Sequence, residues 1–273
     1  MSGGKIEAAV EKIRSEGRVG LMTHIVLGYP SLDESLKLVE TMAACGVDVI
    51  EIQIPFSDPT ADGPVITRAC QAALDGGVRV QDAFEFMEAV SGRFELPFLF
   101  MSYFNIAFAY RQEASGGRGG ADGVAGFVAA SAAAGASGLI LPALPPEMVR
   151  EGYREACDKA ALHPVYVVSP NTGKERLELI AEAGSGLLYA TSRTGTTGKE
   201  MDLQMQELAG FLASARETCG MPIAVGFSIS TREQVELLRG HADIAVVGTH
   251  FIRTWQEGGV EALAAELNKL TGS

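Results

Sequence analysis

Short runs of aliphatic and β-branched residues alternate along the whole chain with longer segments whose apolar residues recur at helical spacing. This alternation is typical of β-α-β units that build a parallel sheet. The expected strands cover residues 19–27, 47–54, 97–102, 138–142, 164–168, 187–191, 222–226 and 243–248. The pattern therefore predicts an α/β protein with eight strands, each followed by a helical segment.

The entries into these runs take two alternating forms. The third, fifth and seventh runs open with proline, in LPFLF, HPVYVV and MPIAV, where a first-residue proline costs no ladder hydrogen bond. The second, fourth and sixth runs are entered through glycine after a helix, in ACGVDVIEI, AAGASGLIL and AEAGSGLLY. This odd and even alternation favours a closed (β/α)8 barrel, whose alternate strands supply alternate core layers. A doubly wound open sheet is the alternative, but no GxGxxG follows the first run.

The ends and loops of the chain complete this picture of one barrel domain over residues 1–273. Residues 3–16 carry Ile6, Val10 and Ile13 at helical spacing, so we expect an extra helix that closes the bottom of the barrel. Residues 110–123 contain too few apolar side chains to pack, and we expect a mobile loop at about 111–123.

Composition restricts the function classes. The chain has 34 acidic against 22 basic residues and a net charge of −12, which disfavours nucleic acid and anionic membranes as partners. The four cysteines show no CxxC pair, so neither a disulfide framework nor a zinc site is predicted. The N-terminus lacks the apolar core of a signal peptide, and no run of about 18 apolar residues suggests a membrane span. We expect a reduced, cytoplasmic protein.

The second run, VIEIQI at residues 49–54, contains a carboxylate where a strand would normally carry an apolar residue. Alternate strand residues share a face, so Ile50 and Ile52 should meet the helices while Glu51 and Gln53 point into the barrel. A buried carboxylate without a partner is costly and is well suited to exchange protons. The alternative is a structural glutamate that is satisfied by a salt bridge or by hydrogen bonds from neighbouring strands.

The loop PFSDPTADGP follows at once and places three prolines and a glycine around Asp58 and Asp62. This composition fixes the backbone and presents side chains at the mouth of the barrel, where we expect a loop at about 56–64. A purely structural alternative is that Asp62 caps a helix over residues 63–75. That alternative explains one aspartate but not the carboxylate beneath the loop.

The string IEIQIPFSDPTADGP resembles the signature of the tryptophan synthase α subunit family, and the resemblance extends over essentially the whole chain. The other matching stretches are LGYPS, YFN at 103–105, SRTGTTG at 192–198, GFSIS at 226–230 and VVGTHF at 246–251. The resemblance implies a TIM barrel, with a short phosphate-binding helix after the eighth strand. It also implies retro-aldol cleavage of indole-3-glycerol phosphate to indole and glyceraldehyde 3-phosphate, in the last steps of L-tryptophan biosynthesis.

The resemblance also implies residue roles. Glu51 would be the acid and base that protonates the indole ring carbon and takes the glycerol hydroxyl proton, and Asp62 would hold the indole N–H. A segment at 192–200 would close as a lid; a plain surface loop is the alternative. The implied substrate-binding residues are Tyr189, Thr197, Gly198, Phe227, Ser228, Gly248 and Thr249.

The resemblance implies neither a metal nor a cofactor in this chain. None of the eight runs projects a lysine for a Schiff base, and the four histidines are scattered. Several positions depart from the family pattern: Val26 replaces a common threonine, Tyr29 and Ala143 replace acids near the mouth, and Ser228 replaces a glycine.

Partners follow from the same resemblance. A β subunit that carries pyridoxal phosphate is expected in an α2β2 assembly, with Asp58, Pro59 and Asn105 at the contact. Two alternatives remain: a stand-alone lyase that releases indole, and a weakly catalytic barrel that activates a β subunit.

Overall fold

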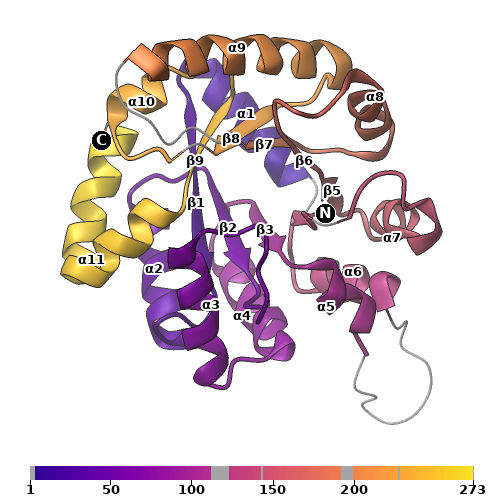
Figure 1. Cartoon of the computed structure of the whole chain (residues 1–273). Coiled ribbons are helices and arrows are strands. Elements are labelled where there is room, and N and C mark those ends of the chain that lie inside the picture. The colour runs from indigo at the N-terminus through magenta and orange to yellow at the C-terminus, as the bar shows by residue number, and fades with distance from the viewer. Residues whose placement is uncertain (1–3, 112–122, 143, 192–198, 227, 273) are drawn as a thin grey trace.

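The computed structural model describes residues 4–111, 123–142, 144–191, 199–226 and 228–272. Its strands form one parallel sheet in the order β5-β4-β3-β2-β1-β9-β8-β7-β6. The strands are β1 (Gly20–Val26), β2 (Val49–Gln53), β3 (Phe98–Met101), β4 (Gly138–Ile140), β5 (His163–Val165), β6 (Val167–Val168), β7 (Leu188–Thr191), β8 (Ile223–Gly226) and β9 (Ile244–Val247). The helices around them (Figure 1) are α1 (Gly4–Ser15), α2 (Leu32–Ala44), α3 (Pro64–Asp75), α4 (Val80–Arg93), α5 (Phe104–Ala109), α6 (Gly123–Ala133), η1 (Val149–Glu151), α7 (Tyr153–Ala160), α8 (Lys174–Ala183), α9 (Lys199–Cys219), α10 (Arg232–Glu236) and α11 (Thr249–Thr271).

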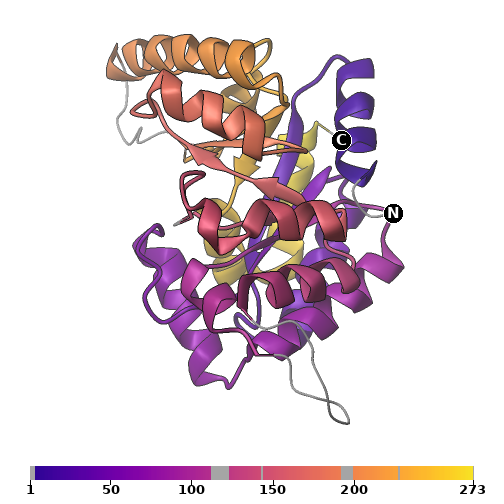
Figure 2. The same ribbon diagram turned by 90° about the vertical axis from the view of Figure 1, so that its right-hand side faces the viewer.

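The sheet closes into a barrel at its fifth strand. β5 and β6 stand at the two ends of the strand order but are separated in sequence by Tyr166 alone. The Tyr166 carbonyl oxygen accepts a hydrogen bond from the backbone N–H of Tyr189, so this residue joins the two ends. The predicted eight-stranded barrel is therefore confirmed, with the fifth strand divided into two segments. Figure 2 shows helices packed around it from a second side.

The two faces of β2 are occupied as the alternation predicts. Ile50 and Ile52 are fully buried in the large cluster that also holds helix residues such as Val39 and Met87. Val49 lies instead in the barrel interior, together with residues of other strands. The isoleucines thus anchor β2 to the helices, which leaves the side of Glu51 and Gln53 turned inward.

α1 closes the amino-terminal end of the barrel, as predicted. Its apolar residues Ile6, Val10 and Ile13 are buried in the same cluster as the interior residues Met22 and Leu187. The helix covers strand ends that would otherwise expose these side chains to water, so its burial stabilises the barrel.

α11 begins directly after β9 and is interrupted at Gly259, where φ is 63° and ψ is −153°. Glycine adopts this left-handed φ with little strain, so the chain bends there. The first segment, residues 249–258, is the short helix that was expected after the eighth strand. None of the helices among the described residues combines the length and the hydropathy of a membrane-spanning segment.

Asp243 connects three elements at the bottom of the barrel. Its carboxylate is 2.8 Å from Arg14 Nε on α1 and 3.0 Å from Arg216 Nη2 on α9, and it accepts the backbone N–H of Ile223 at 2.8 Å. Burial would raise the Asp243 pKa, but the Arg14 hydrogen bond, the Ile223 N–H and the Arg216 charge together lower it. The ionised carboxylate is therefore the form that the fold stabilises.

We expect Asp243→Asn to lower the free energy of unfolding at pH 7 by about 2–3 kcal/mol, because an amide satisfies fewer of these donors. A lowered folded-state pKa contributes stability that is present above the unfolded pKa and is lost as the pH falls through the folded pKa. The difference between variant and wild type should therefore shrink in acid, below the usual aspartate pKa of 3.8. Urea unfolding at several pH values measures it, with Asp158→Asn as the matched control in the exposed Arg154 pair. A control loss as large as that of Asp243→Asn would contradict the assignment.

Candidate active site

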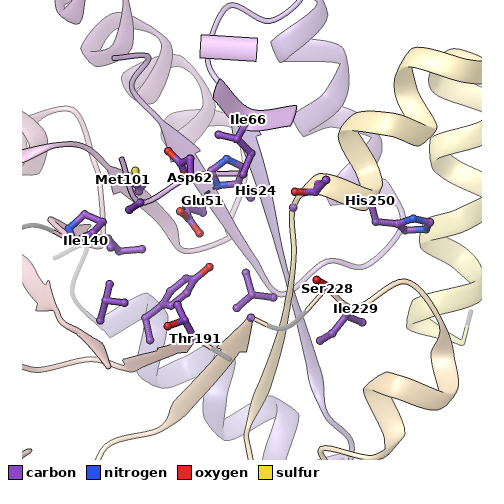
Figure 3. A pocket seen from close by; sticks show the side chains of 18 of the residues that line it. His24, Glu51, Asp62, Ile66, Met101, Ile140, Thr191, Ser228, Ile229 and His250 are labelled. Carbon is purple, nitrogen blue, oxygen red and sulfur yellow. Dashed lines mark ion pairs between the residues drawn. The ribbon is translucent and has the colours of Figure 1, made fainter. Parts of the chain in front are cut away.

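A cavity of about 460 Å³ opens at the carboxyl ends of the strands. Thr191 ends β7, Gly226 ends β8 and Gly248 follows β9, so the strand ends meet around it. Figure 3 shows Glu51, Asp62 and His24 side by side in this cavity. The other lining residues include Ile66, Met101, Ile140, Pro142, Val167, Tyr189, Ser228, Ile229, Ser230, Val246, Thr249, His250 and Arg253. This is the end of the barrel where catalytic groups of the fold gather.

Glu51 is only 3% exposed and has two unlike carboxylate oxygens. Oε1 lies 3.1 Å from Nδ1 of His24, which is its register neighbour on β1. Oε2 is buried and has no hydrogen-bond partner among the described residues. The alternative of a structural ion pair thus accounts for one oxygen only. The other oxygen is available to a molecule in the cavity.

The surroundings of His24 favour the protonated form of its imidazole. Burial alone would lower the pKa of its imidazole, but the negative charge of Glu51, the hydrogen bond to Glu51 and the charge of Asp62 together raise it. The pair therefore favours an imidazolium beside a carboxylate.

Asp62 is positioned by two donors on a single oxygen. Gln53 Nε2 donates to Oδ2 at 2.7 Å, and the Tyr103 hydroxyl donates to the same atom at 2.9 Å. Tyr103 also accepts the backbone N–H of Ala61 at 3.0 Å, which fixes the loop above β2. In the described part of the chain no hydrogen bond reaches Oδ1, so this oxygen can accept one from a ligand.

Asp62 does not cap the following helix. The N-cap of α3 is Gly63, and no side chain makes a cap hydrogen bond there. The capping alternative from the sequence is therefore wrong: Asp62 turns back over the cavity because Gln53 and Tyr103 bind its carboxylate. Burial of Tyr103 and the charge of Asp62 raise the tyrosine pKa, so its hydroxyl stays a donor.

Tyr189 on β7 lines the cavity together with both carboxylates, as the sequence suggested. Burial, followed by the negative charges of Glu51 and Asp62, raises its pKa well above the usual value. The residue therefore presents a neutral phenol to whatever occupies the cavity.

The opposite end of the cavity suits an anion. Gly248 is the N-cap of α11, and the first N–H groups of a helix have no partner within it. Ser228 has a φ of 30°, a conformation that favours glycine, so the backbone after β8 keeps the shape that a glycine would give it. Thr249 adds a hydroxyl, and Arg253 adds a cation that the sequence reasoning did not single out.

Gly248 also approaches β1 closely. A Cβ built at this residue would lie 3.3 Å from Cβ of His24, which is tighter than an ordinary contact. A side chain at residue 248 would therefore press on His24, so glycine allows the start of α11 to pack against the strand.

The remaining residues that the sequence singled out fall into three groups. Thr197, Gly198 and Phe227 lie outside the described residues. The same holds for Ala143 and for most of the expected lid at 192–200. The expected contact residues Asp58 and Asn105 are exposed, whereas Pro59 is buried. Tyr29 packs with its neighbours beside α3 and α11, and its hydroxyl accepts a hydrogen bond from Gln256 on α11.

Sequence reasoning missed His24 and Tyr103 as site residues. His24 lies on the first run, two residues after Met22, which faces the barrel interior. Because residues two apart on a strand share a face, this alternation could have identified His24 as an inward-facing residue. Tyr103 lies in the matching stretch YFN but lacked an assigned role. Within the described ranges, no three His, Cys, Asp or Glu side chains are grouped so that they could hold a metal ion.

Comparison with known proteins gives a consistent result. The family model described as "Tryptophan synthase alpha chain" matches residues 10–271. The tryptophan synthase alpha chain of Desulforapulum autotrophicum is 42% identical over 265 residues, which cover 97% of this chain and 99% of that protein. That of Syntrophotalea carbinolica is also 42% identical, with the same coverage.

Solved structures agree with the sequence relatives. A Mycobacterium tuberculosis tryptophan synthase structure matches with a TM-score of 0.86 and 30% identity, covering 98% of this chain and 97% of that chain. Tryptophan synthase subunit alpha from Legionella pneumophila matches with a TM-score of 0.85 and 29% identity, with the same coverage.

Proposed function

Because the chain belongs to the tryptophan synthase alpha chain family, we propose that Glu51 and Asp62 carry out the retro-aldol cleavage of indole-3-glycerol phosphate. The products are indole and glyceraldehyde 3-phosphate, and the reaction is that of a carbon–carbon lyase. One observation carries the assignment of the residues: two carboxylates share one cavity, and each has one oxygen bound by the protein and one available.

Asp62 serves the indole ring. Its Oδ1 accepts the indole N–H, while Gln53 and Tyr103 hold Oδ2 in place. When the ring carbon at the scissile bond gains a proton, positive charge develops on the ring nitrogen. A preorganised carboxylate at that position stabilises the charge without reorganising.

Glu51 moves the protons. Its Oε2 first delivers a proton to the ring carbon and then removes the proton of the adjacent glycerol hydroxyl. The hydroxyl becomes the aldehyde carbonyl as the carbon–carbon bond breaks, and the electrons of that bond return to the ring and neutralise the nitrogen. Glu51 gives one proton and takes one back in each cycle, so one group serves as both acid and base.

The phosphate occupies the other end of the cavity. The N–H groups at the start of α11, the Thr249 hydroxyl and the backbone at Ser228 form the receptor, with Arg253 as a nearby cation. This places the anion away from the two carboxylates. The family motif adds Phe227 and Gly198 to this end and Thr197 near Asp62, with residues 192–200 closing over the substrate.

A pyridoxal-phosphate β subunit is the proposed partner, in an α2β2 assembly, and this chain needs no cofactor of its own. The docking face would include Asp58 and Asn105, which are both exposed, next to the α5 side chain Phe108, which is 57% exposed. The Ala61 to Tyr103 hydrogen bond ties the Asp58 loop to the start of α5. Pro59 would support this loop from within.

An indole-release assay with and without the β subunit tests the function. We expect the purified chain to release indole slowly from indole-3-glycerol phosphate, and the β subunit to raise the rate at least about tenfold through coupling between the subunits. A matched variant, Phe108→Asp, should keep the basal rate and lose the rise. A basal rate that the β subunit leaves unchanged would indicate a stand-alone lyase. No indole release under either condition would contradict the proposed catalysis.

A further inference from the structure

His24 is a buried histidine whose contact with Glu51 the proposed chemistry does not yet use. It is 6% exposed, lies on β1 and lines both the large cavity and a small apolar space. Nδ1 contacts Glu51, whereas Nε2 is buried with no hydrogen-bond partner among the described residues. A buried imidazole that served only the core would be expected to have partners on both nitrogens, but here only Nδ1 has one among the described residues.

The titratable and polar groups near this imidazole belong to several elements. Glu51 and Gln53 on β2, Asp62 before α3 and Tyr189 on β7 face it around the cavity, and His250 and Arg253 line that cavity from α11. His24 also lines a small apolar space together with Tyr29, Leu38, Met42, Phe251, Ile252 and Trp255. The carboxylate of Glu51 lies 3.1 Å from Nδ1, and its charge, together with that of Asp62, favours the protonated imidazole.

We propose that His24 is a positioning residue for Glu51 and holds the catalytic proton between turnovers. Nδ1 binds Oε1, which turns Oε2 toward the substrate. The proposal rests on the proposed function of Glu51 and adds to it a second residue that the family signature does not contain.

The proton balance of this dyad closes over one turnover. At rest the pair shares one proton, which His24 Nδ1 holds against Oε1 of Glu51. Nδ1 passes this proton to Oε1, the carboxyl group rotates so that the protonated oxygen takes the place of Oε2 and faces the substrate, and that oxygen gives the proton to the ring carbon. The same oxygen then receives the glycerol hydroxyl proton as the carbon–carbon bond breaks and the carbonyl forms. The reverse rotation returns this proton to Nδ1, so no other acid, base or redox partner is required.

The sign of the pH dependence follows from the direction of the pKa shift. The His24 pKa lies above its usual value of 6.5 because the Glu51 interactions outweigh burial. The His24–Glu51 pair holds its proton at a pH below this folded-state pKa. The pair loses the proton as the pH rises through the pKa. We therefore expect kcat to fall on the alkaline side with an apparent pKa above 6.5, which belongs to the His24–Glu51 pair.

The first test needs no activity. Imidazole NMR signals of His24, titrated with pH, should report a pKa above 6.5 in the wild type and a value below 6.5 in Glu51→Gln, where burial remains but the charge is gone. An unchanged His24 titration in Glu51→Gln would overturn the pairing, whether or not the protein cleaves indole-3-glycerol phosphate. This readout separates failure of the inference from failure of the proposed function.

The second test compares two variants of His24 kinetically. His24→Phe removes both nitrogens. We expect its kcat to fall at least about tenfold while KM stays within about threefold of wild type. The fall of kcat with rising pH, which we call the alkaline limb of the pH profile, should disappear. His24→Asn keeps a hydrogen-bond donor near the place of Nδ1. Its kcat should therefore lie above that of His24→Phe, but its pH profile should still lack the alkaline limb. Thermal unfolding confirms that both variants are folded.

The matched control is His163→Asn, which alters another histidine–glutamate pair at the bottom of the barrel, with Nε2 3.2 Å from Glu7 Oε1. This variant should keep kcat and the wild-type pH profile. The inference is overturned if folded His24→Phe retains wild-type kcat and its alkaline limb. It is also overturned if His24→Asn retains the limb at the wild-type pH, because asparagine cannot hold the proton.

Discussion

Glu51→Gln will abolish measurable indole release, with kcat reduced at least about 1000-fold and substrate still bound. The magnitude follows because general acid–base catalysis contributes about 10²–10⁴-fold, and this one carboxylate serves in both directions. Glutamine keeps the shape and can still accept a hydrogen bond from His24 Nδ1, but its amide cannot take the hydroxyl proton. Steady-state kinetics on the isolated chain, read as kcat and KM separately, make the measurement.

The control for this variant is Glu40→Gln, which removes an equal charge from the exposed ion pair with Arg93 on the outside of the barrel. It should keep wild-type kcat. Turnover by Glu51→Gln within about tenfold of wild type would show that another group moves the protons, and the assignment of Oε2 would fall with it.

Asp62→Asn will reduce kcat about 10²–10³-fold, because it removes the negative charge that faces the ring nitrogen in the transition state. The amide oxygen can still accept from Gln53 and Tyr103, so the loop should stay in place. The amide nitrogen then replaces Oδ1, so the site loses both the negative charge and the acceptor of the indole N–H. KM should change less than kcat, since the positive charge develops only after binding. The same indole assay measures both constants.

Two companion variants sharpen this second prediction. Tyr103→Phe removes one of the two donors on Oδ2 and should cost about tenfold, because Gln53 still holds the carboxylate. Asp58→Asn changes the exposed aspartate of the same loop and should leave the basal rate of the isolated chain unchanged. If Asp58→Asn were the slower of the two aspartate variants, the roles given to these residues would be reversed.

The fold could be predicted because its signals are local. Alternation within each run separated the helix-facing isoleucines of β2 from the inward Glu51, and the structure confirms this division. Proline and glycine at alternate strand entries indicated a closed barrel, since each reflects the backbone of a few residues. The break at Tyr166 was not predicted, because the run PVYVV is continuous in apolar pattern and the division depends on which neighbour each half pairs with.

The site was predicted only in part. A carboxylate on a strand and two aspartates on a proline-rich loop are visible in the sequence, and the resemblance to a family supplied their roles. The helix-capping alternative for Asp62 could not be eliminated from sequence, because aspartate before a helix is a common cap. Its rejection came from Tyr103, which lies 41 residues away and donates to Oδ2.

The sequence by itself determined which residues lie inside each strand and which loops carry polar groups, because strand alternation and turn chemistry depend on neighbouring residues. Tertiary structure alone decided which inward residues meet. His24 faces Glu51 because β1 and β2 pair in a register that sets these two residues opposite each other. That register results from the packing of the whole barrel, so the partner of the buried carboxylate became visible only when the strands were assembled.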